Sequence, residues 1–169
     1  MGDTKNLVSQ EAIAKIQHIA EGEIAMLCTF TPDHAMEARP MATQGIGADG
    51  TLWFFSSKDS NVNQQIIANP EVQLIYMVPG KFEYLTLDGT GSVSRDRAKI
   101  DELWSSIAKA WFPQGKDDPD LTLVTVTLSG GHYWDTKNGK MVSLAKIALA
   151  VVTGRPMDGG VEGSLHVRS

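Results

Sequence analysis

The spacing of hydrophobic positions changes several times along the chain, and each change marks an expected element. After Ser9, apolar residues recur every three or four positions, which predicts a helix that Ser9 caps and Gly22 ends. Short apolar or alternating segments follow, and they predict strands at 24–30, 36–46, 51–56, 71–78, 82–94, 121–128 and 132–134. Helical spacing returns over 60–68 and 95–111, and residues 141–152 form a further candidate helix.

The order of these elements favours one fold class. Strands follow one another along most of the chain, and the regular strand–helix alternation of a doubly wound sheet is absent. We therefore predict a mainly β (α+β) fold, a closed or partly closed antiparallel barrel with peripheral helices. With 169 residues, the chain is expected to form a single domain over 1–169, in which the glycine-rich segment from about 155 to 169 is a tail on the surface.

Composition excludes several classes of function. Fifteen basic and 20 acidic residues give a net charge of −5, which argues against a nucleic-acid surface. The single cysteine, Cys28, excludes an internal disulfide and is compatible with a reducing cytoplasm. No apolar run approaches the ~20 residues of a membrane span, and the first ten residues lack the apolar core of a signal peptide.

Three potential motifs have plain structural interpretations. Residues 45–50 read Gly-Ile-Gly-Ala-Asp-Gly, but a strand follows instead of the helix that a dinucleotide site needs, so we predict a hairpin turn at Asp49-Gly50. The four histidines are scattered and have no partners at ligand spacing, so no metal site is expected. Cys28 lies within an apolar strand and is predicted to be a buried thiol.

The segment from Ser56 to Val62 joins a strand to a short helix and is a candidate anion site. Ser60 can cap the helix, and the N–H groups of Asn61, Val62 and Asn63 then lack helical acceptors. Such a helix end attracts a phosphate, and Ser56, Ser57 and Lys58 add hydroxyl groups and a positive charge. Taken alone, however, the segment is better explained as an ordinary capped helix.

A proline within a strand marks the second candidate. Pro40 cannot donate to a neighbouring strand, so the stretch Arg39-Pro40-Met41-Ala42-Thr43-Gln44 is predicted to be an edge, a bulge or an unpaired stretch. Unpaired backbone beside an arginine can hold a flat, anionic cofactor. Taken alone, an edge strand with a surface arginine is the simpler interpretation.

Together, these two segments resemble the FMN-binding split barrels of the pyridoxamine 5′-phosphate oxidase superfamily, in particular the bacterial general stress protein branch. The resemblance covers nearly the whole chain, and the block WFPQGKDDPDLTL within it is the most specific to the branch. The residues that carry it are ARPMATQ (38–44), LWFFSSKDSNVNQQI (52–66), NPEVQLIY (69–76), SRDRAKIDELWSSIAKAWFPQGKDDPDLTLVTV (94–126), HYWDTKNGKMVSL (132–144) and VTGRP (152–156).

The resemblance implies a homodimer that binds FMN at the subunit interface. Arg39 and Ser60 would contact the FMN phosphate, Phe55 and Ser56 would approach the ribityl chain and the ring edge, and Trp111 would close the pocket of the partner subunit. The backbone that would flank the isoalloxazine ring runs through Pro40, Met41, Ala42, Thr43 and Gln44. Relatives commonly carry a lysine where this chain has Val62, so Lys58 or the backbone donors at the start of the helix would have to replace its charge.

For function, the resemblance implies an FMN-binding general stress-type protein that acts as a flavin-dependent oxidoreductase of unknown substrate. The alternatives are a non-enzymatic protein that sequesters flavin, and a relative that binds F420 or haem. Pyridoxamine phosphate oxidase activity is not carried over, because the C-terminal segment offers only His166 and Arg168 as candidate phosphate contacts. The flavin performs its own redox chemistry, and no residue is assigned as a catalytic acid or base.

Overall fold

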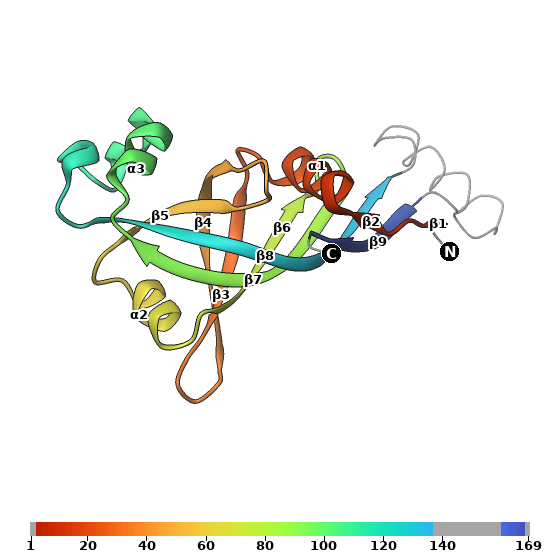
Figure 1. Cartoon of the computed structure of the whole chain (residues 1–169), viewed down its shortest axis with the longest axis horizontal. Helices are drawn as coiled ribbons and strands as arrows, with labels where there is room; N and C mark the ends of the chain where they lie inside the picture. Colours follow the sequence, from red (N-terminus) through yellow and green to blue (C-terminus); the bar gives the residue numbers. More distant parts are fainter. Residues whose placement is uncertain (1–2, 137–159, 168–169) are drawn as a thin grey trace.

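The computed structural model describes residues 3–136 and 160–167 (Figure 1). The turn expected at Asn138-Gly139 and the helix expected over 141–152 lie outside the described residues. In chain order, the elements are β1 (Asp3–Thr4), β2 (Leu7–Val8), α1 (Ser9–Ala20), β3 (Ile24–Phe30), β4 (Met36–Ile46), β5 (Leu52–Ser57), α2 (Asn61–Ala68), β6 (Glu71–Val78), β7 (Glu83–Ser94), α3 (Arg97–Leu103), the 3₁₀ helices η1 (Ser106–Ala110) and η2 (Gly115–Asp117), β8 (Leu121–Thr136) and β9 (Gly160–His166).

The two longest strands, β7 and β8, close the sheet into a barrel. Neighbouring strands follow the order β8–β5–β4–β3–β6–β7, and the last strand, β7, pairs along its length with the first, β8. All of these pairings are antiparallel. In Figure 1, α2 and α3 lie at one end of the long β7–β8 ribbon, and α1 lies towards the other. The predicted split barrel with peripheral helices is confirmed.

Strand β4 changes its neighbour halfway along, and this change opens the barrel wall. Residues 36–42 are in register with β3, whereas Thr43, Gly45 and Ile46 are in register with β5, with a bulge at Gln44. Within the described structure, the first half of β4 therefore has a strand on one side only. Of the alternatives that Pro40 predicts, the structure shows an edge: residues 36–42, which include Arg39, pair with β3 and are unpaired on their other side.

The barrel interior and one face of α1 share a continuous hydrophobic core. Fully buried strand residues include Leu27, Phe54, Leu74, Leu85 and Val126. The face of α1 that the sequence period predicts supplies the rest of this side of the core, namely Ala12, Ile13, Ile16, Ile19 and Ala20. The hairpin predicted at Asp49-Gly50 is also confirmed, and Gly50 adopts φ +83°, a conformation that favours glycine.

A second hydrophobic cluster docks α3 against the barrel, and it explains why the helix expected over 95–111 is interrupted. Ile100 of α3 packs with Leu121 and Leu123 of β8. The helix ends where Trp104, with ψ of 128°, turns to pack against Phe55 at a ring-centroid distance of 5.8 Å. The expected single helix is therefore wrong, and the chain continues as η1 and η2.

The C-terminal segment, expected to be a tail, adds a strand to the sheet. β9 pairs antiparallel with the second half of β8 and parallel with β1 and β2. A Cβ atom at Gly163 would collide with the carbonyl oxygen of Lys5, so glycine allows this close crossing. Two strands were expected in place of β8, but β8 runs unbroken through Gly130 and Gly131. It does so because β7 pairs with β8 on both sides of a bulge between Asp88 and Gly89.

The start of α1 differs from the prediction. β2 remains paired with β9 as far as Val8, so Val8 rather than Ser9 occupies the position before the helix, and no side chain caps it. The expected capping by Ser9 is therefore wrong, whereas Gly22 follows the helix end with φ +73° as predicted. Within the described ranges, no helix combines the length and apolar character needed to cross a bilayer.

Candidate functional site

Arg39 lies on the unpaired half of β4 and contacts three polar side chains. Its Nη2 donates to Glu37 Oε2 at 3.2 Å and to Gln65 Oε1 at 2.9 Å. Its Nη1 donates to the hydroxyl of Thr29, which in turn donates to Gln65 Oε1. Gln65 Nε2 completes the ring by donating to Glu37 Oε2 at 2.7 Å. Strands β3 and β4 and helix α2 therefore converge on one guanidinium group, whose side chain is 21% exposed.

The partners of Gln65 fix the orientation of its amide. The oxygen accepts from Arg39 and Thr29, and the nitrogen faces the Glu37 carboxylate. The reversed amide would direct its hydrogens at a guanidinium and its oxygen at a carboxylate, which is unfavourable on both sides. Because Thr29 is fully buried, Arg39 is anchored from the interior while its charge remains near the surface. An arginine held in this way is preorganised to bind an anionic oxygen.

The start of α2 forms the second half of the site. Ser60 is the N-cap, as predicted, and its hydroxyl accepts from the Asn63 N–H at 3.4 Å. The N–H groups of Asn61 and Val62 have no acceptor in the described part of the chain, as is usual for a first helical turn. Asn61 and Gln65 are four residues apart and share one face of the helix. The Arg39 cluster therefore lies on the side of α2 that carries Asn61, one turn from the end of the helix where these N–H groups are free.

A buried polar network fixes where α2 begins. Asn63 donates to Thr122 Oγ1 at 2.9 Å and to the Ser57 carbonyl oxygen at 3.0 Å, and it accepts from Ser56 Oγ at 2.7 Å. Ser56 and Thr122 also share a hydrogen bond of 2.8 Å. These contacts connect α2, β5 and β8. The Ser56 hydroxyl, expected near a bound ribityl chain, is therefore already hydrogen-bonded to Asn63 and Thr122, and Ser56 is only 5% exposed.

Lys58 precedes α2, but its charge is already paired. Lys58 Nζ lies 2.7 Å from Asp120 Oδ1, and the Lys58 N–H donates to the Asp120 carbonyl oxygen at 2.8 Å. The hydrogen bond to Asp120 and the negative charge of that carboxylate raise the pKa of Lys58. Lys58 therefore joins the β5–α2 turn to the start of β8 and offers less free positive charge than its sequence position suggests.

Val62, where relatives commonly carry lysine, faces the interior and is 5% exposed within the main core. We therefore expect Val62→Lys to give no tighter FMN binding and to lower the free energy of unfolding by at least about 2 kcal/mol, because the ammonium group would lie unpaired among apolar side chains. Urea denaturation measures this loss, and Asn61→Lys, at an exposed neighbouring position, is the matched control with little expected change. A Val62→Lys protein of wild-type stability would contradict the burial argument.

The remaining predicted residues of β4 lie on different faces of the strand. Thr43 points inward and shares a hydrogen bond of 2.8 Å with a buried tyrosine hydroxyl, and Met41 packs against the core. Pro40 and Ala42 are exposed on the opposite face, and the half-buried Gln44 occupies the bulge. Side chains alternate along a strand, so a flat ligand on one face would meet only alternate members of this set.

Phe55 and Trp111 belong to the α3 side of the molecule. Phe55 packs against Trp104, on the opposite face of β5 from Ser56. Trp111 follows η1 and is 70% exposed, so within one chain it is not buried against Arg39 or the start of α2. The cluster includes Gln65 and Glu37, which sequence reasoning had not singled out. Their partnership with Arg39 depends on contacts between β4 and a distant helix.

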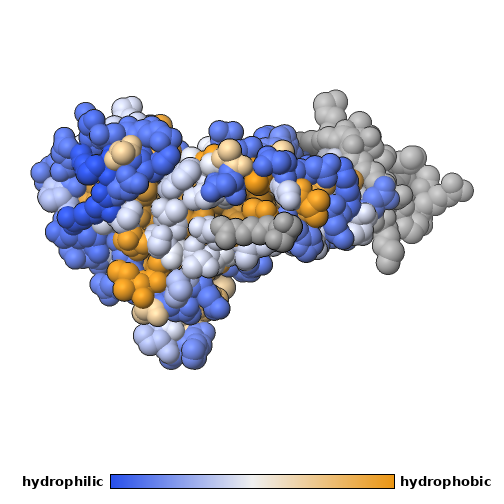
Figure 2. All heavy atoms as spheres, in the orientation of Figure 1, coloured by the Kyte–Doolittle hydropathy of each residue, from blue (hydrophilic) through white to orange (hydrophobic). Residues whose placement is uncertain are grey.

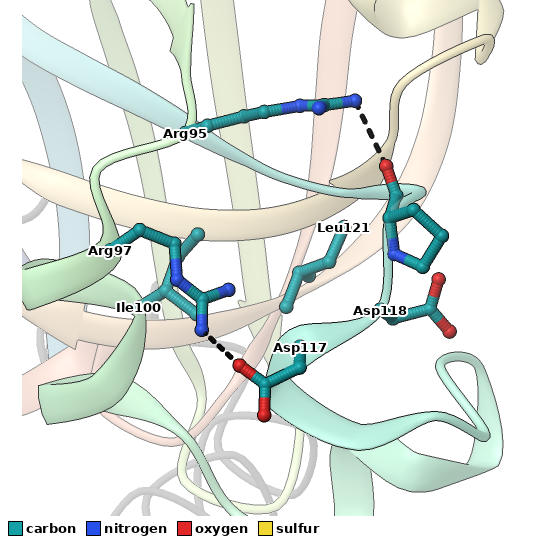
Figure 3. Close-up of a pocket in the computed structure, with 7 residues that line it drawn as sticks. Arg95, Arg97, Ile100, Asp117, Asp118 and Leu121 are labelled. Atoms are coloured by element: carbon teal, nitrogen blue, oxygen red, sulfur yellow. Dashed lines mark hydrogen bonds and ion pairs between the residues drawn. The ribbon is translucent and has the colours of Figure 1, made fainter.

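A small cavity of about 160 Å³ lies between α3, η2 and the start of β8 (Figure 3). Among the residues that line it, Arg95 donates to the Pro119 carbonyl oxygen at 2.9 Å, and Arg97 Nη2 lies 2.5 Å from Asp117 Oδ1. Both guanidinium groups are thus engaged with the segment before β8. Ligand pockets usually measure roughly 300–1,000 Å³, so this cavity is too small to enclose a whole flavin.

Metal-ligating side chains do not converge in groups of three or more within the described residues. His18 Nε2 lies 2.9 Å from Glu83 Oε1. His132 Nε2 is 3.8 Å from Glu162 Oε2, and its ring packs against Trp134. These two histidines therefore take part in pairwise contacts.

Comparison with known proteins agrees with the barrel fold. A family model described as pyridoxamine 5′-phosphate oxidase like matches residues 11–158. The chain belongs to the pyridoxamine 5′-phosphate oxidase-like family. That match includes β3, β4, β5 and α2, the elements that form the Arg39 cluster and the helix end beside it.

Two proteins of known structure and one further relative are similar to the chain. A protein assigned as general stress protein 26 from Jannaschia sp. CCS1 is 29% identical, with a TM-score of 0.74, and the match covers 91% of this chain and 96% of the other. The general stress FMN/FAD binding protein of Xanthomonas citri is 26% identical, with a TM-score of 0.63 and coverage of 73% and 87%. Protein bli-3 of Neurospora crassa is 23% identical over 123 residues, which span 68% of this chain and 58% of that relative.

Proposed function

We propose that the protein binds FMN and acts as a flavin-dependent oxidoreductase of the general stress type, on a substrate that is not assigned, in the cytoplasm. One observation carries the proposal: an arginine anchored from the interior lies on the unpaired half of β4, beside the helix face that begins at Asn61. The FMN/FAD binding named for the Xanthomonas citri relative supports it. The single cysteine supports the reducing compartment.

The donor set fits a phosphate. Arg39 would contact it with a charged fork, Gln65 would add an amide hydrogen, and the first N–H groups of α2 would complete the shell. The exposed backbone of residues 40–42 would border the ring. Bound FMN would supply electron transfer, and the chain would hold its phosphate, orient its ring and limit access of water.

Titration of the flavin-free protein with FMN, followed by flavin fluorescence, tests the binding. Riboflavin is the matched ligand, because it has the same ring and ribityl chain without the phosphate. We expect saturable FMN binding at least about tenfold tighter than that of riboflavin, the size of one charge-assisted hydrogen bond or more. Absence of FMN binding at micromolar concentrations would overturn the proposal. Equal affinity for the two ligands would show that Arg39 does not contact the phosphate.

The redox role needs a separate measurement. The FMN-loaded protein is reduced with dithionite, freed of excess reductant and mixed with a soluble dye acceptor. Electron transfer to the dye at a rate above that of the apoprotein supports an oxidoreductase. A loaded protein whose flavin neither accepts nor transfers electrons would instead indicate that the protein sequesters flavin.

We further infer that two chains associate through the outer face of β3, β4 and β6. Met26 lies between Pro40 and Ile75 in this part of the sheet. Large apolar side chains are exposed around it, with fractional exposures of 61% for Ile24, 38% for Met26 and 62% for Met77. An exposed apolar sheet face of this kind is typical of protein interfaces. The unpaired half of β4 borders it, so a second chain would cover the proposed flavin site.

We expect Met26→Glu to separate the dimer, because the carboxylate would be buried without a partner in the interface. Light scattering should give about twice the 18.3 kDa chain mass for the wild type and a single chain mass for the variant. Val8→Glu is the matched control, at an exposed position beside β9 rather than on this face. A wild-type protein that scatters as a single chain would contradict the dimer. Figure 2 also shows a hydrophobic patch over α2, a helix whose residue Ile67 is 74% exposed, and this second surface is open to the same test.

A further inference from the structure

Glu37 places a carboxylate oxygen where the Arg39 cluster would bind an anion. Glu37 Oε2 accepts from Gln65 Nε2 at 2.7 Å and from Arg39 Nη2 at 3.2 Å. An anionic oxygen held between a guanidinium and an amide hydrogen is the arrangement that a bound phosphate oxygen would have. The cluster therefore already contains an anion, supplied by the same strand two residues before Arg39.

The contact between Glu37 and Arg39 prevents a phosphate from forming two parallel hydrogen bonds with the same guanidinium. A guanidinium forms two parallel hydrogen bonds to a phosphate either through Nη1 and Nη2 or through Nε and Nη2. Both modes use Nη2. Its two hydrogens are directed at Glu37 Oε2 and Gln65 Oε1. A phosphate can therefore bind Arg39 through two parallel bonds only after one of these acceptors has moved.

Glu37 is the acceptor that can move. Its side chain is 47% exposed, and it extends from the half of β4 that has no second neighbouring strand in the described structure. Gln65 is held more firmly, because its oxygen also accepts from the buried Thr29 hydroxyl. When Glu37 turns towards solvent, Arg39 Nη2 and Gln65 Nε2 each release one hydrogen toward the same point.

We propose that Glu37 is an internal competitor for the anion site, and that it makes the site selective for ligands ending in a phosphate monoester. This proposal rests on the proposed function, because it concerns the phosphate of the same ligand. A phosphate monoester carries about 1.5–2 negative charges at pH 7 and three acceptor oxygens, so it can displace one carboxylate. A ligand with a single carboxylate would only exchange one such group for another and would gain little.

The test compares FMN, riboflavin and inorganic phosphate on the whole 169-residue chain. Glu37→Gln keeps the length and hydrogen-bonding capacity of the side chain and removes its charge. We expect it to tighten FMN binding about tenfold, equivalent to one modest charge-assisted contact, and to leave riboflavin affinity unchanged. Glu21→Gln, at an exposed position after α1, changes the net charge equally and is the matched control with no expected effect.

Each outcome decides between the two proposals. FMN affinity that is equal in wild type and Glu37→Gln, or weaker in the variant, overturns the competitor role and leaves FMN binding intact. A similar gain in Glu21→Gln would attribute the effect to net charge and would also overturn it. If no flavin binds to any variant, the proposed function fails. In that case inorganic phosphate, titrated by calorimetry, must bind Glu37→Gln more tightly than wild type, or the competitor role fails as well.

Discussion

Replacing Asn63 by alanine is expected to lower the free energy of unfolding by about 3 kcal/mol, because the substitution removes the centre of a buried network. The Asn63 amide makes three hydrogen bonds, to the hydroxyls of Ser56 and Thr122 and to the Ser57 carbonyl oxygen, and the residue is 1% exposed. Each such bond contributes roughly 0.5–1.5 kcal/mol net, and partners left unpaired in the interior add a desolvation cost. Urea denaturation followed by tryptophan fluorescence measures the loss.

Two companion variants make the interpretation specific. Asn61→Ala alters an exposed asparagine two residues earlier in the same helix and should change stability by no more than about 0.5 kcal/mol. Thr122→Val removes a shared partner, so the double variant with Asn63→Ala should lose less than the sum of the single losses. Additive losses would indicate that the two side chains stabilise the protein independently, and a loss at Asn63 no larger than at Asn61 would contradict the network.

Local chemistry explains which elements the sequence predicts well. The turn at Asp49-Gly50 depends on one glycine and its neighbour, and the cap of α2 depends on Ser60 and the residues immediately after it. Pro40 likewise indicates an edge, a bulge or an unpaired stretch because it lacks an N–H, whatever lies around it. In each case, the deciding interaction spans only a few residues.

The errors arise where distant segments decide the outcome. The spacing of Ile107 and Trp111 continues the apolar face of α3, yet both residues are more than two-thirds exposed, at 74% and 70%. The helix stops earlier because Trp104 packs on Phe55, nearly 50 residues away in sequence. Similarly, Gly130 and Gly131 read as a break between strands, but pairing with β7 carries β8 through them.

The candidate site shows the same division. Arg39 and Ser60 stand out in the sequence because a proline and a helix cap mark their positions. Gln65 and Glu37 carry no such local signal, and they join the site only because β3, β4 and α2 meet. Val62 shows the converse, since its place in a recognisable motif suggests a phosphate contact while helical periodicity places its side chain in the core.

Replacing Arg39 by alanine is expected to weaken FMN binding about 100-fold while the barrel stays folded. Two charge-assisted hydrogen bonds to phosphate, at roughly 1.5–3 kcal/mol each before compensation by water, account for an effect of this size. Riboflavin affinity should change little, because riboflavin has no phosphate. Stability should fall by at most about 1 kcal/mol, since the Thr29 hydroxyl keeps Gln65 as a partner and the pairing with Glu37 is partly exposed.

Arg39→Lys separates charge from geometry. Lysine retains the positive charge but cannot form two parallel hydrogen bonds, so its FMN affinity should fall between those of the wild type and Arg39→Ala. Arg95→Ala is the matched control, because Arg95 is an exposed arginine that contacts the Pro119 carbonyl oxygen at the cavity beside α3. If Arg95→Ala weakened FMN binding as much as Arg39→Ala, the loss would not be specific to Arg39, and the unpaired half of β4 would lose its proposed role.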